Sequence, residues 1–358
     1  MPHSIQEGIE AFKRGEIIVV TDDDDREGEG DLIVAASLCT PEKMAFIVRH
    51  TSGIVCTPLT VDEARRLRLD PMVAMNDSAH TTAFTISIDY RYGTTTGISA
   101  DDRTTTVRAL TNPNAGHADF ARPGHIFPLI AKEGGVLMRS GHTEAAVDLC
   151  KLADLPPVGV ICELVNDDGT VTKGKQVSDF AARHKLVHIT TADLIAWRQS
   201  REKLVERIST FSSDSSIGTL QGYAYRTPFD PVYHIAFVYG QIGDGRAVTT
   251  RFHRSNVVTD VLGGAKSVTA ALEKFKQDGR GVLVYLRDGA AGVPAVAPDA
   301  ASSSEDARTK QWREIGVGAQ ILRDLGVTSI RNLSHVNRDY VGLSGFGIEI
   351  CEHIPFEG

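Results

Sequence analysis

Residues 16–31, EIIVVTDDDDREGEGD, give the clearest indication of how the first half folds. The first six residues of this stretch are rich in Ile and Val, which is typical of a short β-strand. The strand pattern ends abruptly in four aspartates, which are followed by Arg26 and by acidic residues that alternate with glycine. Charge and glycine gathered at a strand end predict a binding site in an α/β-type arrangement.

Helix and strand patterns alternate outward from this stretch over the first two hundred residues. Residues 1–15 have the apolar spacing of an amphipathic surface helix. Thr40-Pro41 resembles an N-cap followed by a proline in the first turn, and it predicts a helix to about His50. The same patterns predict strands at 83–88, 158–165 and 186–190, and helices at 104–110, 143–153, 178–185 and 192–208.

A boundary is expected at residues 209–216 (STFSSDSS), which are rich in serine and predict a linker. Beyond it the patterns predict strands at 232–239 and 281–287, helices at 267–277 and 309–325, and a loop at 289–305. The sequence therefore predicts an α+β first domain, residues 1–208, with a central mixed sheet and flanking helices. A smaller α/β domain, residues 217–358, follows the linker.

Composition excludes several classes of protein. A length of 358 residues suggests about two domains. The formal net charge of −8 argues against nonspecific nucleic-acid binding. No apolar run reaches the roughly 18 residues of a membrane span, and the amino terminus lacks a secretory pattern, so a cytoplasmic location is expected. The five cysteines include no close pair, which indicates neither a disulfide framework nor a Cys-x-x-Cys zinc site.

Two segments carry the candidate chemistry. A bare aspartate run is usually a solvated turn, but Glu27, Glu29 and Asp31 are separated by glycines, so their backbone can approach a ligand. Such oxygen ligands suit Mg²⁺. In the second segment, residues 139–144 (RSGHTE), the amides around Gly141 lie at a predicted helix N-terminus, a natural phosphate cradle. His142 would then lie beside a phosphorylated substrate, placed for metal coordination or proton transfer.

A third segment, Arg122-Pro-Gly-His125, precedes an apolar run. A single histidine is more often a packed or surface residue than a catalytic one, so this motif indicates little by itself.

Together these segments resemble the 3,4-dihydroxy-2-butanone-4-phosphate synthase family. Six motifs match in order over about 150 residues, so chance is a poor explanation of the resemblance. They are residues 22–31 (DDDDREGEGD), 50–56 (HTSGIVC), 95–105 (TTGISADDRTT), 122–129 (RPGHIFPL), 140–145 (SGHTEA) and 162–169 (CELVNDDG). One departure is Ser140, where the family more usually has glycine; it affects the shape of the loop rather than its chemistry.

The resemblance implies a role for each candidate residue. Glu27 and His142 would bind a divalent metal, Mg²⁺ or Mn²⁺, with Glu29 nearby through water. Arg26, Asp31 and the loop Arg139, Ser140, Gly141, His142 and Thr143 would hold the sugar phosphate. His125 and Glu163 would be acid/base groups, joined in catalysis by Glu27 and Asp31. Asp22, Cys56 and Thr96 would line the pocket.

The implied reaction removes C4 of ribulose 5-phosphate as formate and leaves a four-carbon dihydroxybutanone phosphate for riboflavin biosynthesis. It needs enolisation, dehydration, a skeletal shift and hydrolysis. A metal chelated by sugar oxygens would stabilise enediolate charge, while carboxylates and a histidine move protons. Several proton transfers require several bases, and neighbouring like charges spread their pKa values.

The second half resembles GTP cyclohydrolase II in stretches that build the fold: 279–287 (GRGVLVYLR), 315–322 (IGVGAQIL) and 343–350 (LSGFGIEI). The family's three zinc cysteines are absent, and Asn256, Ser267 and Thr269 take their places. Its glycine- and arginine-rich loop is replaced by residues 288–294 (DGAAGVP). Its acidic-aromatic pair reads Glu314-Ile315, and later positions read Ser334, His335 and Asp339. We expect no zinc and no cyclohydrolase activity.

Three functional hypotheses follow. The first is a synthase with a degenerate partner domain, acting on a sugar phosphate as a homodimer in which His125 reaches the partner's site, with no nucleic-acid or membrane partner. The second is a bifunctional enzyme that retains cyclohydrolase activity. The third is a non-catalytic regulatory or scaffold protein, against which the retained set Arg26, Glu27, Asp31, His125, His142 and Glu163 argues.

Overall fold

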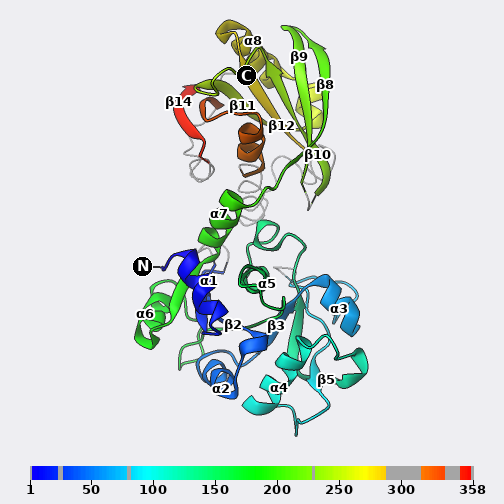
Figure 1. The fold of residues 1–358 in the computed structure, drawn as a ribbon, viewed down its shortest axis with the longest axis vertical. Coiled ribbons are helices and arrows are strands. Elements are labelled where there is room, and N and C mark those ends of the chain that lie inside the picture. The colour runs from blue at the N-terminus through cyan, green and yellow to red at the C-terminus, as the bar shows by residue number, and fades with distance from the viewer. Residues whose placement is uncertain are drawn as a thin grey trace. The chain divides into compact units, whose positions relative to one another are not determined.

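The computed structural model describes residues 2–22, 27–78, 82–227, 230–287, 316–334 and 347–355. The chain divides into two compact units, residues 1–195 and 196–358, which are described separately (Figure 1). The chain passes from one unit to the other within helix α7 (Thr191–Arg201).

Unit 1 is built on one mixed sheet with helices on both sides. Its helices are α1 (Ile5–Lys13), α2 (Pro41–His50), α3 (Val61–Leu67), α4 (Ala100–Leu110), α5 (His142–Leu152) and α6 (Lys175–His184), followed by the start of α7. Its strands are β1 (Ile18–Thr21), β2 (Gly30–Ala35), β3 (Cys56–Leu59), β4 (Ile88–Tyr90), β5 (Phe120–Ile130), β6 (Gly159–Glu163) and β7 (Val187–Thr190).

The seven strands lie in the order β4-β5-β3-β6-β2-β1-β7. The pairs β1–β7 and β3–β5 are parallel, and the other described pairs are antiparallel. The predicted mixed sheet with flanking helices is therefore confirmed.

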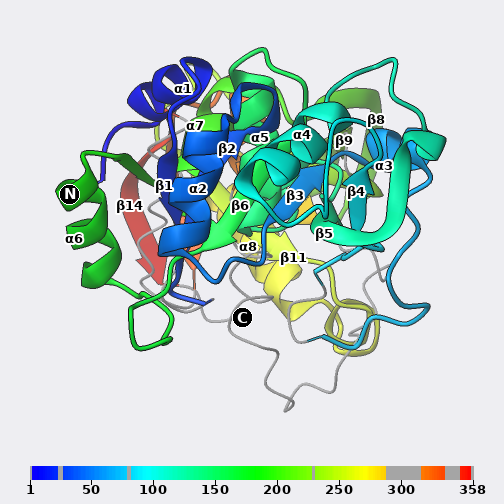
Figure 2. The same ribbon diagram turned by 90° about the horizontal axis from the view of Figure 1, so that it is seen from below.

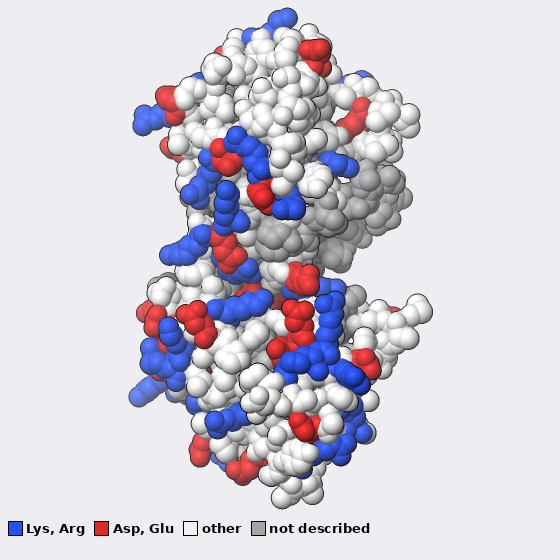
Figure 3. All heavy atoms as spheres, turned by 45° about the vertical axis from the view of Figure 1, so that its right-hand side comes forward, with Lys and Arg blue, Asp and Glu red and all other residues white. Residues whose placement is uncertain are grey.

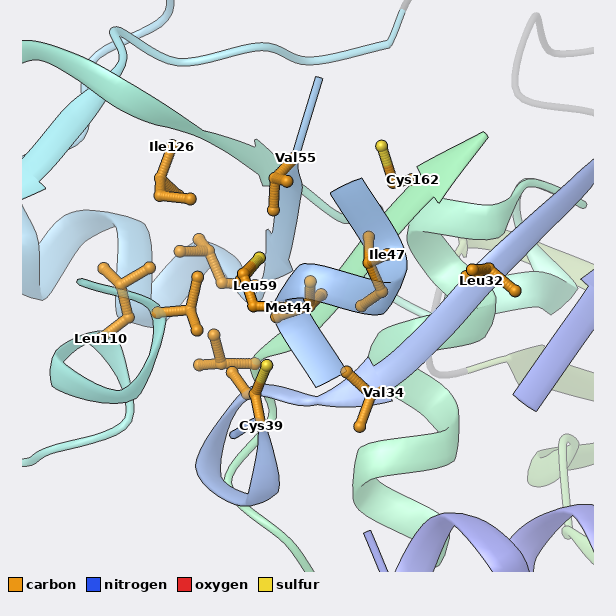
Figure 4. Packing of buried hydrophobic residues seen from close by; sticks show 14 of the residues in the cluster. Leu32, Val34, Cys39, Met44, Ile47, Val55, Leu59, Leu110, Ile126 and Cys162 are labelled. Carbon is orange, nitrogen blue, oxygen red and sulfur yellow. The ribbon is translucent and has the colours of Figure 1, made fainter. Parts of the chain in front are cut away.

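One face of the sheet packs against α2, and we call it the α2 face. Met44 and Ile47 of α2 are fully buried in one cluster with Leu32, Val34 and Leu59 of the sheet (Figure 4). Burial of each such side chain stabilises the fold by about 1.5–3 kcal/mol. Helices α2 and α4 lie side by side over this face (Figure 2).

The opposite face carries α5, and we call it the α5 face. Strand alternation places Asp31 and Ile33 of β2 there, because Leu32 and Val34 point into the α2 cluster. Gly159 of β6 faces α5 closely, since a Cβ at this position would lie 2.9 Å from that of Ala146. The N-terminus of α5 therefore lies on the same side of the sheet as the Asp31 carboxylate.

Unit 2 contains a second mixed sheet, in the order β14-β13-β11-β12-β10-β9-β8. Its strands are β8 (Glu206–Ser215), β9 (Gly218–Thr227), β10 (Asp230–Tyr239), β11 (Val248–Arg254), β12 (Gly281–Leu286), β13 (Ser329–Ser334) and β14 (Glu349–Pro355). Its described helices are α8 (Lys266–Asp278), a π-helical turn η4 (Val258–Leu262) and residues 316–324. The predicted second α/β domain is confirmed, while the predicted loop 289–305 lies outside the described residues.

The predicted linker 209–216 is wrong. These residues belong to edge strand β8 and to its hairpin turn, and Ser209 to Ser215 pair with Ala224 to Gly218 of β9. An edge strand needs no continuous apolar side chains, because its outer surface faces water and its stability comes from backbone pairing. Most of β8 is exposed, so serine and threonine are tolerated there.

Two other elements differ from the sequence prediction. The strand expected at 83–88 begins only at Ile88, and Phe84 and Thr85 form isolated bridges instead. The helix expected at 192–208 ends at Arg201, and the chain re-enters as β8. In the second case the buried Leu204 and Val205 lie beyond the end of the helix, in the segment that leads to β8.

In the described parts of the chain, no helix is both long and apolar enough to cross a bilayer. Basic and acidic side chains are interspersed over the face drawn in Figure 3, without a broad area of one sign. The cytoplasmic location stays a prediction.

Four rings join α2 to α6, and we call them the ring cluster: Phe46, His50, Phe180 and His184. The centroids of His50 and His184 are 5.0 Å apart, and those of Phe180 and His184 are 4.4 Å apart. Burial, with the nearby His184 and Arg49, lowers the pKa of His50, which Asp167 only partly opposes. Acid therefore weakens this contact, because protonation places a charge on a partly buried ring beside His184 and Arg49.

Replacing His50 with Phe is expected to lessen the loss of thermal stability on acidification. A lowered folded-state pKa contributes stability that is present above the unfolded value, about 6.5, and lost as pH falls through the folded value. The melting temperatures of wild type and H50F should therefore converge, or cross in favour of H50F, between pH 7.5 and pH 5.5. The exposed His117 offers a control in H117F. A difference between wild type and H50F that does not change with pH would refute the prediction.

Candidate active site

A cavity of about 150 Å³ opens in unit 1 where the α5 face of the sheet meets the N-terminus of α5. The residues around it come from distant parts of the sequence. They are Glu27, Asp31, Ile54, Cys56, Thr82, Phe84, Leu129, Arg139, His142, Thr143, Ile161, Cys162 and Glu163.

Strand register explains why these residues converge. Asp31 of β2 is directly opposite Glu163 of β6, and Cys56 of β3 is opposite Ile161 of the same strand. Side chains directly opposite each other share a face. Glu163 is exposed at the cavity, whereas Asp31 is only 2% exposed.

Three side chains of the site form a group that could hold a metal ion. One ligand atom from each of Asp22, Glu27 and His142 lies within 4.8 Å of the other two. Two carboxylate oxygens and one imidazole suit Mg²⁺ or Mn²⁺. The sequence-based prediction named Glu27 and His142 as metal ligands and Asp22 only as a pocket residue. Sequence spacing does not show which of four adjacent aspartates contributes to the site.

A buried carboxylate beside this group is a second indication that the site suits a bound cation. Asp31 Oδ1 has no hydrogen-bond partner within the described residues, and it lies 3.5 Å from His142 Nδ1. Burial, followed by the charges of Glu163 and Glu27, raises the pKa of Asp31 well above its usual value. The pKa of Glu163 is also raised, first by desolvation and then by Glu29 and Glu27. Like charge concentrated in this way is relieved by a bound cation or by protons.

The N-terminus of α5 lies where the sequence predicts a phosphate cradle. The helix begins at His142, and its N-cap Gly141 provides no side-chain cap, so backbone N–H groups of the first turn point outward. A Cβ at Gly141 would lie 2.5 Å from Arg139 Nη1, which explains the glycine. Ser140 and Thr143 are both buried, at 8% and 4% exposed, so the serine is accommodated without opening the loop.

The Arg139 side chain is held by Glu144, which is not among the predicted site residues. Glu144, 1% exposed, accepts a hydrogen bond of 2.7 Å from Arg139 Nη1 and another of 3.0 Å from Lys132 N. Thr82 Oγ1 accepts from Arg139 Nη2 at 2.8 Å. The motif S-G-H-T-E could have indicated Glu144, because a glutamate at the third helical position can accept from the N-terminus of its own helix. Here its carboxylate accepts from Arg139 and Lys132 instead.

The acidic loop is also tied to Lys173, which precedes α6. Lys173 Nζ donates to the backbone oxygen of Glu27 at 2.7 Å and lies 3.2 Å from the carboxylate of Glu29. Glu29 is thus paired with a lysine rather than placed in the group of metal-capable side chains. The predicted substrate residue Arg26 lies outside the described residues.

His125 and Thr96 do not line this cavity. His125, in β5, makes a 2.7 Å hydrogen bond between its Nδ1 and Asp89 Oδ2, and Thr96 is exposed in the loop before α4. One chain therefore places Glu27, Asp31, Arg139, His142 and Glu163 around a single cavity, and its own His125 does not line that cavity.

Replacing Gly124 with Ala is expected to disrupt the segment that presents His125. A Cβ at Gly124 would overlap the backbone of Ile88 and Asp89 in β4, which cannot move away as a side chain can. A forced overlap in a packed region costs about 1–3 kcal/mol or more. We expect a melting temperature several degrees lower, by about 2–4 °C per kcal/mol, and loss of formate release. Gly169 also has a positive φ, but a Cβ at this position would meet nothing within 4 Å. G169A is therefore a control for the backbone strain of alanine without a steric overlap. Full activity of G124A would contradict this account.

In unit 2, two of the positions expected for zinc cysteines have other structural uses. Asn256 Oδ1 accepts hydrogen bonds from Val258 N and Thr259 N at 3.0 and 3.3 Å. Ser267 Oγ lies 3.3 Å from Arg251 Nη2. Within the described residues, the one group of three metal-capable side chains lies in unit 1. Residues 288–294, Glu314, Ile315, His335 and Asp339 lie outside the described residues.

Comparisons with known families agree with this division. Residues 6–197 match the model of 3,4-dihydroxy-2-butanone 4-phosphate synthase, and residues 206–355 match that of GTP cyclohydrolase II. The riboflavin biosynthesis protein RibBA of Bacillus cereus is 42% identical over 100% of this chain and 94% of its own.

Solved structures match either nearly the whole chain or little more than half of it. A structure of RibBX, a two-domain 3,4-dihydroxy-2-butanone 4-phosphate synthase from A. baumannii, is 36% identical with a TM-score of 0.81, over 97% of this chain and 99% of that one. A synthase structure in complex with two magnesium ions is 44% identical with a TM-score of 0.54, over 56% of this chain and 98% of that one. The chain therefore belongs to the 3,4-dihydroxy-2-butanone 4-phosphate synthase family, as an enzyme of riboflavin biosynthesis whose synthase unit is followed by a GTP cyclohydrolase II-like unit.

Proposed function

We propose that unit 1 converts D-ribulose 5-phosphate to 3,4-dihydroxy-2-butanone 4-phosphate and formate at the cavity beside α5. One observation carries the proposal: ligand atoms of Asp22 and Glu27, from one loop, and of the distant His142 lie within 4.8 Å of one another. The uncapped first turn of α5 lies next to them and suits a phosphate.

Glu27 and His142 would hold a divalent ion, Mg²⁺ or Mn²⁺, with a carboxylate oxygen of Asp22 as the third ligand. The ion supplies positive charge next to the reacting sugar oxygens. The magnesium-bound relative supports this choice of metal. No zinc is proposed for unit 2, because Asn256, Ser267 and Thr269 stand where the cyclohydrolase family has its zinc cysteines.

The other residues would bind substrate and move protons. Arg139 and the amide of Thr143 bind the phosphate, while Asp31 and Glu163 accept and return protons. Their raised pKa values favour this role, since a carboxyl that holds a proton nearer neutral pH exchanges it more readily with a sugar carbon or hydroxyl. Cys56 forms part of the wall.

We also propose that the chain acts as a homodimer, in which His125 and Thr96 complete the cavity of the second copy. Neither residue lines the cavity of its own chain. The large apolar side chains Ile54, Tyr92 and Ile98 are 53%, 59% and 50% exposed, and Ile98 lies two positions from Thr96. Exposed apolar groups of this kind favour a protein partner.

Subunit complementation tests this arrangement. Chains with Glu27→Gln and chains with His125→Gln are expected to be inactive separately, and to regain activity when mixed and allowed to exchange. A mixed dimer has one cavity with both residues intact. Mixtures that stay inactive although the chains have exchanged would argue against it.

For unit 2 we propose that cyclohydrolase activity is absent. The support is that Asn256 and Ser267 replace thiolate ligands and make local hydrogen bonds instead. The bifunctional alternative predicts GTP turnover with bound zinc.

One experiment separates the three hypotheses. The purified chain is incubated with Mg²⁺ and ribulose 5-phosphate and, separately, with Zn²⁺ and GTP, and formate is measured. Formate from the sugar alone is the expected result. Formate from both substrates would establish a bifunctional enzyme, and formate from neither would leave a non-catalytic protein.

A further inference from the structure

The backbone of Glu29 lies between two neighbours, Asp22 on one side and Lys173 on the other. Its N–H donates to Asp22 Oδ1 at 2.9 Å, and its carbonyl oxygen accepts from Asp22 N at 3.3 Å. On the other side it forms an antiparallel bridge with Lys173, and Gly174 N donates to Gly28 O at 3.3 Å. The segment just before α6 therefore supports the loop that carries two of the three metal-capable side chains.

The Lys173 ammonium makes two contacts with this loop. Its Nζ donates to the backbone oxygen of Glu27 at 2.7 Å and lies 3.2 Å from the carboxylate of Glu29. The first contact holds the peptide group of a proposed metal ligand. The second holds the Glu29 carboxylate, which is not part of the metal-capable group found among the described residues.

These contacts fix the position of the loop more than they stabilise the fold. The Lys173 side chain is 54% exposed, and an ion pair so open to water contributes little to the free energy of unfolding. The loop is also confined on the side of α6, because a Cβ at Gly30 would lie 2.5 Å from Cγ1 of the fully buried Val177. The loop is thus packed against α6 at Gly30 and held by Lys173 at Glu27.

We propose that Lys173 is a positioning residue for the divalent ion. It holds the loop so that Asp22 and Glu27 face the His142 imidazole, which lowers the cost of ordering these ligands when the ion binds. Partners of metal ligands commonly act in this way, although they touch neither ion nor substrate. The inference rests on the proposed function and deepens it, because it concerns the ion of the same site.

The binding test replaces Lys173 with Met, which keeps the length of the side chain and removes its charge. Titration of Mg²⁺ without substrate should give a Kd about 10–100-fold weaker in K173M than in wild type. The melting temperature in metal-free buffer should change by no more than about 2 °C, because the lysine is half-exposed. K173R should bind Mg²⁺ within about threefold of wild type, since a guanidinium keeps the charge and the donors.

Lys175 provides the matched control for a lost positive charge. It lies two residues further along, its side chain is 86% exposed, and it pairs with Asp179 of its own helix at 2.6 Å. K175M should therefore bind Mg²⁺ as wild type does. Hydrogen exchange in metal-free buffer gives a second readout: amides of residues 27–31 should exchange faster in K173M than in wild type or K175M.

Kinetics separate a role in binding the ion from a role in the chemical step. The Mg²⁺ concentration for half-maximal formate release should rise in K173M by the same factor as the Kd. At saturating Mg²⁺ the kcat of K173M should return to within about threefold of wild type, because the bound ion then holds its own ligands. A loss of kcat that excess Mg²⁺ does not restore would overturn the proposal.

Two binding results would also overturn it: an unchanged Kd in K173M, or an equal weakening in K175M. The proposed function can fail separately. If wild type binds Mg²⁺ and K173M weakens that binding as expected, but no formate is released from ribulose 5-phosphate, the proposed reaction is wrong and the role of Lys173 stands.

Discussion

Replacing Glu27 with Gln, or His142 with Gln, is expected to lower formate release from ribulose 5-phosphate by a factor of about 10³ or more. A divalent ion placed by charged ligands contributes several kcal/mol of transition-state stabilisation, and about 4 kcal/mol corresponds to that factor. Both side chains belong to the described metal-capable group. The reaction is followed by coupling formate to a dehydrogenase, at saturating Mg²⁺.

A second measurement separates loss of the metal from loss of the fold. Titration of Mg²⁺ in the absence of substrate should give a Kd at least tenfold weaker in either variant, with unchanged melting curves in metal-free buffer. Glu42→Gln, exposed on the first turn of α2, is the matched control. Wild-type turnover in E27Q or H142Q would rule out this pair as the metal ligands.

Replacing Glu144 with Leu is expected to destabilise unit 1 strongly and to weaken substrate binding. Glu144 is 1% exposed and Arg139 has a 13% exposed side chain, so the variant leaves an arginine largely buried without its carboxylate. Breaking a buried pair by removing one partner costs about 3–5 kcal/mol, which for a unit of this size lowers the melting temperature by roughly 10 °C. KM should rise, because Arg139 is no longer aimed at the cradle.

The double variant R139M/E144L provides the control for this prediction. Replacing both partners of a buried pair with apolar residues is often close to neutral for stability, so its melting temperature should recover while KM stays high. If E144L melts like wild type, the pair does not stabilise the fold. If the double variant keeps a wild-type KM, Arg139 does not bind the phosphate.

The sequence predicted elements whose patterns are local. The strand run before the acidic loop, the Thr40-Pro41 start of α2 and the N-terminus of α5 appear at or within two residues of the expected positions. Each is decided by neighbouring residues: β-branched side chains, a cap or the first turn of a helix. The pairing of Glu27 with His142 was predicted by family motifs, and periodicity alone could not have given it.

What the sequence could not predict depends on packing between distant segments. The serine-rich segment 209–216 resembles a linker until its backbone is seen paired with β9. Glu144 was passed over because its carboxylate bonds Arg139, and no local pattern shows that partner. The grouping of Asp22 with the metal-capable side chains depends on how the loop after β1 turns, which four consecutive aspartates leave undetermined.

The reaction proposed for unit 1 is tested most directly by following C4 of the substrate. Ribulose 5-phosphate labelled with ¹³C at C4 is incubated with the full chain and Mg²⁺, and the products are observed by NMR. The label is expected to appear in formate and to be absent from the four-carbon phosphate, and the reaction is expected to stop in E27Q. Label retained in the sugar phosphate, or formate formed equally well by E27Q, would contradict the proposal.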